Sequence, residues 1–452
     1  MRRLFGTDGV RGLANEALSC ERAMQIGRAL GTVLSSRHKY RPKVLIGMDT
    51  RISSPMLACA ISAGLCSVGS DVVNLGVVPT PAVAYLVKKH RAKAGVMISA
   101  SHNPYPYNGI KIFGDEGYKL SDELEEQIES IVLDNTPPCR PAPADGLGRY
   151  EEAPNALHDY VGYLSNTAKT SLEGMHLVID AANGAAHRTA KELFEGLGAK
   201  CTFLSCEPDG TNINAACGST DMAALQKEVL RQKADVGLAF DGDADRFLAV
   251  DEKGNAVDGD FIMAILALHL KEEGRLNGNT VVGTIMTNYG FMKFCERVGI
   301  RYIAAKVGDR YVLEMLNQEG YVFGGEQSGH IIFREFATTG DGQLTAVQLL
   351  SHLKNAGKPL SELCKVMKKY PQSTVNIEAD ASDKINFFTD EDIKVILEEA
   401  KSQIGEHGRI VVRPSGTEPV IRIMVECDSE DQTQKIAEQT ATKIKARLDE
   451  YK

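Results

Sequence analysis

Short apolar runs alternate with stretches typical of helices through the first half of this chain. Residues 44–47 and 95–98 are apolar runs of strand length, and residues 55–68 and 82–89 have the length and composition of helices. Such alternation is typical of a sheet covered by helices, because a sheet and a helix each bury one apolar face against another layer. The sequence therefore predicts an α/β fold.

The same pattern returns further along the chain and changes after about residue 370. Strands are expected at residues 177–180, 236–240 and 280–284, with helices at 189–197 and 261–270. Beyond residue 370, two strand-like runs (409–412 and 421–425) and two helical stretches (391–404 and 431–452) predict a smaller α+β domain. The proline-rich residues 136–143 cannot continue a helix and mark the end of a first domain near residue 150.

Length and composition exclude several classes of protein. With 452 residues the chain is too long for one ordinary core, and 43% apolar and 25% charged residues are the usual mix of a globular protein. No apolar run approaches the roughly 18 residues of a membrane span, and the first residues lack the apolar stretch of a secretory signal. The ten cysteines form no C-x-x-C pair, so we expect reduced thiols and a cytoplasmic location. A net charge of −9 argues against a nucleic-acid partner, while local arginine clusters still allow an anionic substrate.

Ser101 follows a predicted strand and stands where the chain turns. A serine at such a place most often caps a helix or bonds its own backbone. Its neighbours favour a catalytic hydroxyl, because His102 can donate to a phosphate oxygen and residues 103–104 (Asn-Pro) keep the hydroxyl out of regular structure. A tight turn at residues 108–109 (Asn-Gly) is expected to return Lys111 to this loop. There Lys111 would be a charge clamp or a general base, with a solvated surface lysine as the alternative.

Three aspartates, Asp241, Asp243 and Asp245, directly follow the apolar run 236–240. Carboxylates this close repel one another unless a cation is present, and ligands of oxygen alone suit Mg²⁺. An EF-hand loop is rejected, because Arg246 stands where that loop requires glycine and a strand precedes the cluster. A solvated acidic turn is the remaining alternative. We expect the strand to deliver the cluster to the ligand-binding edge of a sheet, with Arg246 facing a phosphate.

Residues 413–419 combine an arginine, two hydroxyls and a glycine. Arginine can bind a phosphate in a bidentate manner, and glycine lets backbone N–H groups approach an anion. Arg422 lies on the strand that is expected to follow. These residues predict a phosphate site, with an ordinary β-turn carrying a surface arginine as the alternative.

Two further glycine-rich loops carry polar side chains. Glu326, Ser328 and His330 lie between two apolar runs, and the carboxylate and hydroxyl could bond neighbouring sugar hydroxyls. The alternative is a hairpin turn with a hydrogen-bonded histidine. Arg11 lies in the other loop, residues 7–12, whose plain interpretation is an N-terminal turn.

Five loops in this order resemble the α-D-phosphohexomutase superfamily: residues 7–12, 99–104, 241–246, 325–330 and 413–419. The resemblance covers essentially the whole chain, and the serine loop and the D-G-D-x-D-R loop are highly specific together. The opening segment 4–12, the sugar loop Gly-Glu-Gln-Ser-Gly-His and the ending 413–419 resemble the bacterial branch that acts on glucosamine phosphates. Relatives that act on glucose and mannose phosphates tend to have methionine where Gln327 stands.

The resemblance implies three α/β layered domains and a small C-terminal α+β domain around a central cleft, each with one functional loop. We place them at residues 1–150, 151–255, 256–368 and 369–452. A homodimer through the first domain is also suggested by the resemblance.

Residue roles are carried over from the resemblance. Ser101 is expected to be a phosphoserine and to bind one Mg²⁺ together with Asp241, Asp243 and Asp245. The catalytic groups are expected to be Ser101, His102, Lys111, Arg11 and Arg246. The substrate-binding groups are expected to be Glu326, Ser328, His330, Arg413, Ser415, Gly416, Thr417 and Arg422.

The implied reaction interconverts glucosamine 6-phosphate and glucosamine 1-phosphate through glucosamine 1,6-bisphosphate. A sugar 1,6-bisphosphate would serve as the primer, and the product would supply amino sugar for cell-wall synthesis. Phosphoglucomutase or phosphomannomutase activity on neutral sugars is the first alternative. A metal-dependent phosphatase with Asp241 as the phosphate acceptor and a phosphosugar-binding protein without catalysis are more distant alternatives. The expected partners are small phosphosugars alone, with no nucleic acid and no membrane.

Overall fold

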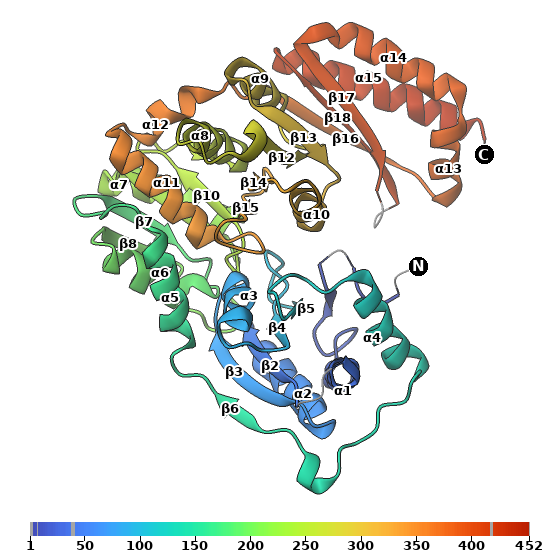
Figure 1. Ribbon diagram of the computed structural model, residues 1–452. Coiled ribbons are helices and arrows are strands. Elements are labelled where there is room, and N and C mark those ends of the chain that lie inside the picture. The colour runs from blue at the N-terminus through green and yellow to red at the C-terminus, as the bar shows by residue number, and fades with distance from the viewer. Residues whose placement is uncertain (1–2, 7, 38–40, 416–418, 452) are drawn as a thin grey trace. The chain divides into compact units, whose positions relative to one another are not determined.

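The computed structural model describes residues 3–6, 8–37, 41–415 and 419–451 (Figure 1). The chain forms two compact units: Met1–Thr284 with Arg301–Lys365, and Ile285–Ile300 with Val366–Lys452. Within the described residues, three sheets belong to the first unit and one sheet belongs to the second.

The first sheet has the order β1-β5-β4-β2-β3-β6. Its strands are β1 (Val10–Leu13), β2 (Lys43–Met48), β3 (Asp71–Val77), β4 (Ala94–Ile98), β5 (Tyr107–Gly114) and β6 (Tyr150–Glu152). The neighbours of β2 and β3 are parallel to them, whereas β5 is antiparallel to both β4 and β1. Helices α1 (Cys20–Arg37), α2 (Ser54–Ser67) and α4 (Asp122–Asp134) share one apolar core with this sheet, and α3 (Thr80–Lys89) packs on the strands β2 and β4.

Two glycines in the first sheet let α3 pack closely against it. A Cβ added at Gly47 of β2 would lie 2.5 Å from Val83 Cγ2, and one added at Gly95 of β4 would lie 2.5 Å from Val87 Cγ2. Val83 and Val87 are both fully buried. The glycines therefore leave room for the valines that anchor α3, and α3 in turn begins at the threonine that reaches the acidic loop described below.

The second sheet has the order β11-β10-β9-β7-β8. Its strands are β7 (His176–Asp180), β8 (Lys200–Leu204), β9 (Val236–Phe240), β10 (Phe247–Val250) and β11 (Ala256–Val257), and its helices are α5 (Ala156–Thr167), α6 (Ala186–Gly196) and α7 (Ala223–Gln232). β9 and β10 are antiparallel, with Phe240 opposite Phe247. The acidic run 241–246 therefore closes a hairpin between two fully buried strands.

The third sheet has the order β13-β12-β14-β15. Its strands are β12 (Thr280–Thr284), β13 (Arg301–Ala305), β14 (Phe323–Gly325) and β15 (Ile331–Phe333), with helices α8 (Gly259–Glu272), α10 (Asp309–Glu319), α11 (Gly342–Ala356) and α12 (Leu360–Leu363). The Asp341 side chain caps α11 by accepting from Leu344 N–H, and it also accepts from the Tyr160 hydroxyl of α5 at 2.9 Å. Asp341 thus joins the second and third sheets of the first unit.

The second unit is a three-stranded antiparallel sheet with helices. β16 (Gln372–Glu378), β18 (Val420–Cys427) and β17 (Gly408–Pro414) lie in that order, with α13 (Ala381–Thr389), α14 (Glu391–Ile404) and α15 (Glu430–Asp449). Helix α9 (Tyr289–Val298) belongs to this unit although it is distant in sequence. Its N-terminus is held by Glu426, which accepts from Asn288 Nδ2 at 2.9 Å and from Tyr289 N–H at 3.1 Å.

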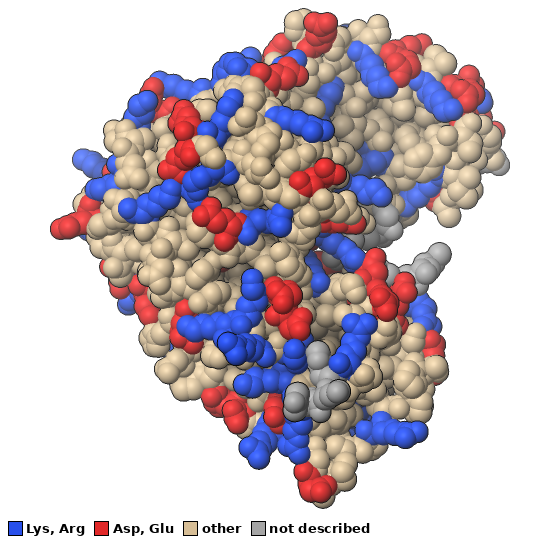
Figure 2. Space-filling model, viewed as in Figure 1, with Lys and Arg blue, Asp and Glu red and all other residues tan. Residues whose placement is uncertain are grey.

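The structure confirms the predicted fold class of helix-covered α/β sheets followed by a small α+β part. The four predicted boundaries stay predictions. In the parts of the chain described, no helix combines the length and apolar character needed to cross a membrane. Figure 2 shows Lys and Arg side chains interspersed with Asp and Glu over the face in view. Neither sign of charge therefore dominates this face.

Candidate functional site

Ser101 lies in the turn between β4 and β5 and points at the acidic loop. Its backbone is left-handed, with φ 53°, a conformation that a non-glycine residue adopts mainly where surrounding contacts impose it. The buried Ser101 Oγ donates to Asp241 Oδ2 at 2.6 Å, and the Ser101 N–H donates to Ser99 Oγ at 3.0 Å. His102 Nδ1 lies 3.5 Å from the same hydroxyl oxygen. The turn thus presents one hydroxyl to a carboxylate that is 140 residues away in sequence.

A buried arginine holds this turn in place. The Arg51 guanidinium donates to the carbonyls of Ser101 (3.0 Å), Asn103 (2.8 Å) and Pro104 (2.7 Å). It also pairs with Asp49 Oδ2 at 2.8 Å, and both side chains are fully buried. No role of Arg51 or Asp49 was predicted from the sequence. Two charged residues directly after the apolar run 44–47 were the signal that could have indicated a role. The three carbonyl partners of Arg51 are visible only in the folded chain.

The tight turn predicted at residues 108–109 is wrong, because both residues lie inside β5. Asn108 is fully buried, and its Nδ2 donates to Ser53 Oγ at 2.8 Å and to Ser54 Oγ at 3.0 Å. A Cβ added at Gly109 would lie 2.5 Å from the carbonyl oxygen of Ser99. Gly109 therefore allows the backbone of β5 to pass close to the backbone at Ser99. Lys111, on the same strand, is buried rather than a solvated surface lysine.

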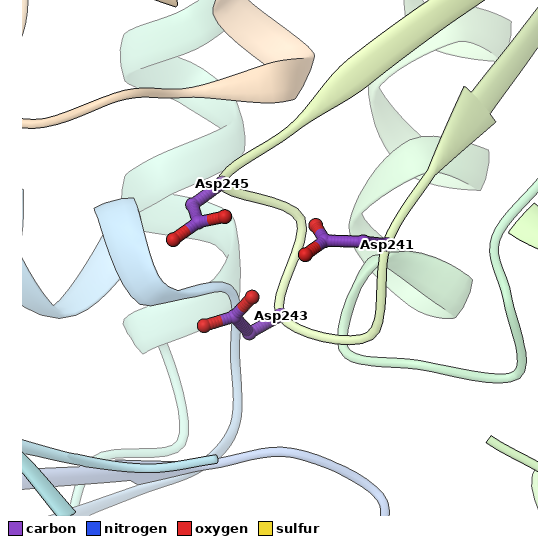
Figure 3. Close-up of side chains that lie close together, drawn as sticks. All are labelled: Asp241, Asp243 and Asp245. Atoms are coloured by element: carbon purple, nitrogen blue, oxygen red, sulfur yellow. The ribbon is translucent and has the colours of Figure 1, made fainter. Parts of the chain in front are cut away.

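Asp241, Asp243 and Asp245 converge at the end of β9 (Figure 3). One oxygen of each lies within 4.8 Å of the others, and all three residues are buried. Asp243 Oδ2 accepts from Thr80 Oγ1 at 2.6 Å, whereas Asp243 Oδ1 and Asp245 Oδ1 are buried without a hydrogen-bond partner among the described residues. Such unsatisfied carboxylate oxygens fit a hard divalent cation such as Mg²⁺.

Neighbouring charges perturb this cluster strongly. Burial, together with Asp245 and Asp243, raises the pKa of Asp241 to about 8. Lys111 Nζ lies 2.8 Å from Asp243 Oδ2 and 3.2 Å from Asp245 Oδ2. Burial opposes the charged lysine, but the carboxylates around it hold the pKa of Lys111 well above its ordinary value. The cluster thus carries a carboxylate surplus that one lysine offsets only in part.

Two other predicted site residues, Arg246 and His102, lie beside the same loop. The Arg246 N–H donates to Asp241 Oδ1 at 3.2 Å, and Arg246 Nε lies 4.0 Å from Asp245 Oδ1. Burial, followed by Arg246 and Arg11, lowers the pKa of His102 to about 4. The His102 ring is therefore neutral at physiological pH and can donate from only one nitrogen.

The predicted sugar loop is the hairpin between β14 and β15. The hairpin turn that was considered as an alternative is present, and it also brings this loop to the aspartates. The Phe247 N–H donates to the Gly329 carbonyl at 3.1 Å, and Ser328 Oγ is buried with no partner in the described part of the chain. His330 Nε2 accepts from the Gly340 N–H at 3.0 Å, which leaves the proton on Nδ1, 3.7 Å from Asp245 Oδ2.

The predicted phosphate loop lies in the second unit. Arg413 of β17 and Arg422 of β18 are directly opposite each other. Burial and the charge of Arg422 lower the pKa of Arg413. Like charges opposite one another on a sheet are unfavourable unless an anion lies between them. Lys384 Nζ, which was not predicted from the sequence, donates to the Ser415 carbonyl at 2.6 Å. Gly416 and Thr417 lie outside the described residues.

Models of four domains of one protein family match this chain in order. Domains I, II and III of phosphoglucomutase/phosphomannomutase (the alpha/beta/alpha domains) match residues 2–138, 158–254 and 258–370, and the C-terminal domain matches residues 364–443. The phosphoglucosamine mutase of Acetivibrio thermocellus is 51% identical over 448 residues, covering 99% of this chain and 100% of the relative. That of Caldicellulosiruptor bescii is 51% identical over 450 residues, with the same coverage. This chain belongs to the phosphoglucosamine mutase family.

Solved structures share the fold of this phosphoglucosamine mutase family member. A phosphoglucomutase/phosphomannomutase family protein from Burkholderia thailandensis superposes with a TM-score of 0.81 at 22% identity, over 98% of this chain and 97% of that chain. A putative phosphomannomutase from Thermus thermophilus gives a TM-score of 0.77 at 22% identity, over 98% of both chains. The predicted resemblance to the phosphohexomutases is therefore confirmed over the whole chain.

For this phosphoglucosamine mutase family member, the first unit brings together most of the predicted site. Its members are Ser101, His102, Lys111, Arg11, Asp241, Asp243, Asp245, Arg246, Glu326, Ser328 and His330. The second unit carries Arg413, Ser415 and Arg422. The individual roles of these residues stay predictions.

Proposed function

We propose that this protein is a phosphoglucosamine mutase that interconverts glucosamine 6-phosphate and glucosamine 1-phosphate. The observation that carries the proposal is the Ser101 hydroxyl, buried and bonded to Asp241 at 2.6 Å in a turn built by Arg51. Its support is the 51% identity to phosphoglucosamine mutases over 99% of the chain. The product would supply amino sugar for cell-wall synthesis.

One Mg²⁺ would be held by Asp241, Asp243, Asp245 and the oxygen of the group on Ser101. When bound, the ion would offset the carboxylate surplus and stabilise negative charge on a phosphoryl group. The two unpartnered carboxylate oxygens, Asp243 Oδ1 and Asp245 Oδ1, support this assignment.

In the proposed reaction the phosphoryl group of phospho-Ser101 passes to the C1 hydroxyl of glucosamine 6-phosphate. The bond between Ser101 Oγ and phosphorus breaks, a bond from the sugar oxygen to phosphorus forms, and the hydroxyl proton leaves to a base. Arg246 and Lys111 would attract the charge of the transferring group, and His102 would donate one hydrogen bond to it. The 1,6-bisphosphate then reorients, and its 6-phosphoryl group returns to Ser101.

Two phosphates must be recognised if the same serine both gives and regains a phosphoryl group. We assign the phosphate that does not react to Arg413, Ser415 and Arg422, with the undescribed Gly416 and Thr417. The opposed arginines support this assignment, because their mutual repulsion favours binding of an anion. Glu326, Ser328 and His330 are assigned to the sugar. All ten cysteines are free, which supports the cytoplasmic location that we propose.

The test is a comparison of kcat/KM for glucosamine 6-phosphate and glucose 6-phosphate with Mg²⁺ and a trace of glucose 1,6-bisphosphate. A preference for the amino sugar is expected. A preference for glucose phosphate would overturn the substrate assignment and retain the mutase mechanism. Net release of inorganic phosphate that persists in Ser101→Ala would show that the protein is a phosphatase and not a mutase.

A further inference from the structure

Residues 306–310, which are the turn after β13 and the first two residues of α10, have no role in the proposed function. Asp309 is the first residue of α10, and its carboxylate pairs with Lys119 Nζ. The N–H of the preceding Gly308 donates to Glu326 Oε1 at 2.9 Å, and Asp309 Oδ2 lies 3.7 Å from His330 Nε2. This one turn therefore contacts two side chains of the sugar loop and one lysine of the first sheet's domain.

Lys119 is a mostly buried cation, 14% exposed, held by two carboxylates. Its Nζ donates to Asp8 Oδ1 at 2.6 Å and to Asp309 Oδ2. Burial opposes the charged form, but Asp309 and then Asp8 raise the pKa of Lys119 above its ordinary value. Loss of the Asp309 charge would leave a mostly buried ammonium with Asp8 as its remaining partner among the described residues, and Asp8 would be drawn toward it.

Asp8 divides its two oxygens between this lysine and the catalytic side. Asp8 Oδ1 accepts from Lys119, whereas Asp8 Oδ2 lies 3.1 Å from Lys111 Nζ and pairs with Arg11. A shift of Asp8 toward Lys119 would therefore loosen the hold on both Lys111 and Arg11. Because Lys111 Nζ is also 2.8 Å from Asp243, such a change reaches the acidic cluster directly.

We propose that Asp309 is a positioning residue that couples the sugar loop to the charged groups beside Ser101. It acts through Lys119 and Asp8 on Lys111 and Arg11, and its own turn fixes Glu326. The inference rests on the proposed function and adds to it a residue that touches neither phosphoryl group nor metal. Displacement of catalytic groups by a fraction of an ångström is costly, because the reaction requires aligned charges.

The adjacent residue, Arg310, offers a matched control. Arg310 pairs with Asp122 of α4 and lies 3.6 Å from Glu125 Oε2. This contact joins the same turn to the same domain as Lys119 does, but it does not lead to Asp8. Asp122→Asn therefore removes a neighbouring, more exposed ion pair while the chain of contacts from Asp309 to Lys111 stays intact.

The experiment measures kcat, KM and Tm for the full-length wild type, Asp309→Asn, Lys119→Met, the double variant and Asp122→Asn. Asp309→Asn is expected to lower kcat by about 10- to 100-fold, with KM for glucosamine 6-phosphate changing by about threefold or less. In the double variant kcat should be no lower than in the worse single variant, because both changes break one chain of contacts. Asp122→Asn should retain kcat within about twofold.

Three outcomes would overturn the inference: kcat of Asp309→Asn within about twofold of wild type, multiplicative losses in the double variant, or an equal loss in Asp122→Asn. If Asp309→Asn unfolds, Lys119→Met removes the other partner of the same ion pair, and the same loss of kcat is expected. A wild type that turns over only glucose phosphate refutes the substrate proposal alone, and the variant ratios are then measured on that sugar. Failure of the two proposals is thus distinguishable.

Discussion

Ser101 Oγ and Asp241 Oδ2 form a 2.6 Å hydrogen bond although 140 residues separate them in the chain. The bond joins the turn after β4 to the turn after β9, so two different sheets must both be folded before the site exists. Both residues are buried, and the serine has a left-handed backbone. The position of the hydroxyl beside the carboxylates therefore depends on contacts from both sheets.

Replacing the serine separates its chemistry from the stability of the fold. Ser101→Ala should abolish mutase turnover, because no oxygen remains to carry the phosphoryl group. The variant loses one hydrogen bond, so its unfolding free energy should fall by about 1–3 kcal/mol. Turnover with a bisphosphate primer and thermal unfolding check both expectations. Wild-type turnover in the variant would exclude Ser101 as the carrier.

The Arg51–Asp49 pair should be one of the most important polar contacts for stability. Arg51→Met leaves the fully buried Asp49 carboxylate without its cation and removes one donor from each of three loop carbonyls, so a loss of about 3–5 kcal/mol is expected. Denaturant unfolding measures it. The control is Arg3→Met, which breaks an exposed pair with Asp134 and should cost about 1 kcal/mol or less. Equal losses in the two variants would contradict the prediction.

Divalent metal should be required for turnover and should stabilise the protein. Excess EDTA is expected to abolish activity, and added Mg²⁺ to restore it. An ion that binds only the folded chain stabilises it by about 2.7 kcal/mol at 100 times its dissociation constant, so Tm should rise with Mg²⁺. Asp243→Asn should weaken both responses. Undiminished turnover in EDTA would show that the aspartates serve another purpose.

The stability of the first unit should decrease in mild acid because of a histidine pair. His269 and His352 have ring centroids 4.2 Å apart, and burial followed by the His269 charge lowers the pKa of His352 from 6.5 to about 4. The unfolded chain then binds more protons than the folded chain between these two pH values. Stability contributed by neutral His352 is therefore present above pH 6.5 and is lost as pH falls toward 4.

His352→Gln removes that titration and should reduce the drop in Tm between pH 7.5 and pH 5. His407→Gln is the control, because that histidine is exposed on the second unit. An identical drop in the wild type and His352→Gln would show that other groups control the acid response.

A close glycine contact should limit substitution in the first sheet. Gly47→Ala places a methyl group 2.5 Å from Val83 Cγ2, so α3 or β2 must move. Overpacking of this kind typically costs about 1–3 kcal/mol. Gly162→Ala on α5 has open space around the new Cβ and should be neutral or slightly stabilising. Denaturant midpoints of the two variants compare them directly.

Local patterns were sufficient for much of the fold. The helix predicted at residues 391–404 is α14 (Glu391–Ile404), and the strand predicted at 236–240 is β9 (Val236–Phe240). Periodicity and apolar length are properties of neighbouring residues, so they can be read without knowing the rest of the chain. The aspartate cluster was found for the same reason, since its three carboxylates lie within five residues.

The Asn-Gly pair at residues 108–109 shows where local patterns fail. It is a common turn signal, yet here it lies within β5, where Asn108 bonds Ser53 and Ser54 and Gly109 passes close to Ser99. Those partners come from distant segments. The carbonyls around Arg51 and the chain from Asp309 through Lys119 to Asp8 were missed for the same reason.

The chain's own order of residues is enough to specify the α/β class, the succession of elements, the carboxylate cluster and the loop motifs that place it among the phosphohexomutases. The protonation preferences of Asp241, His102 and Lys111, and the contacts that fix Ser101, arise only on folding. Both depend on burial and on charges brought within a few ångströms from remote parts of the chain, and these quantities have no counterpart in a local sequence pattern.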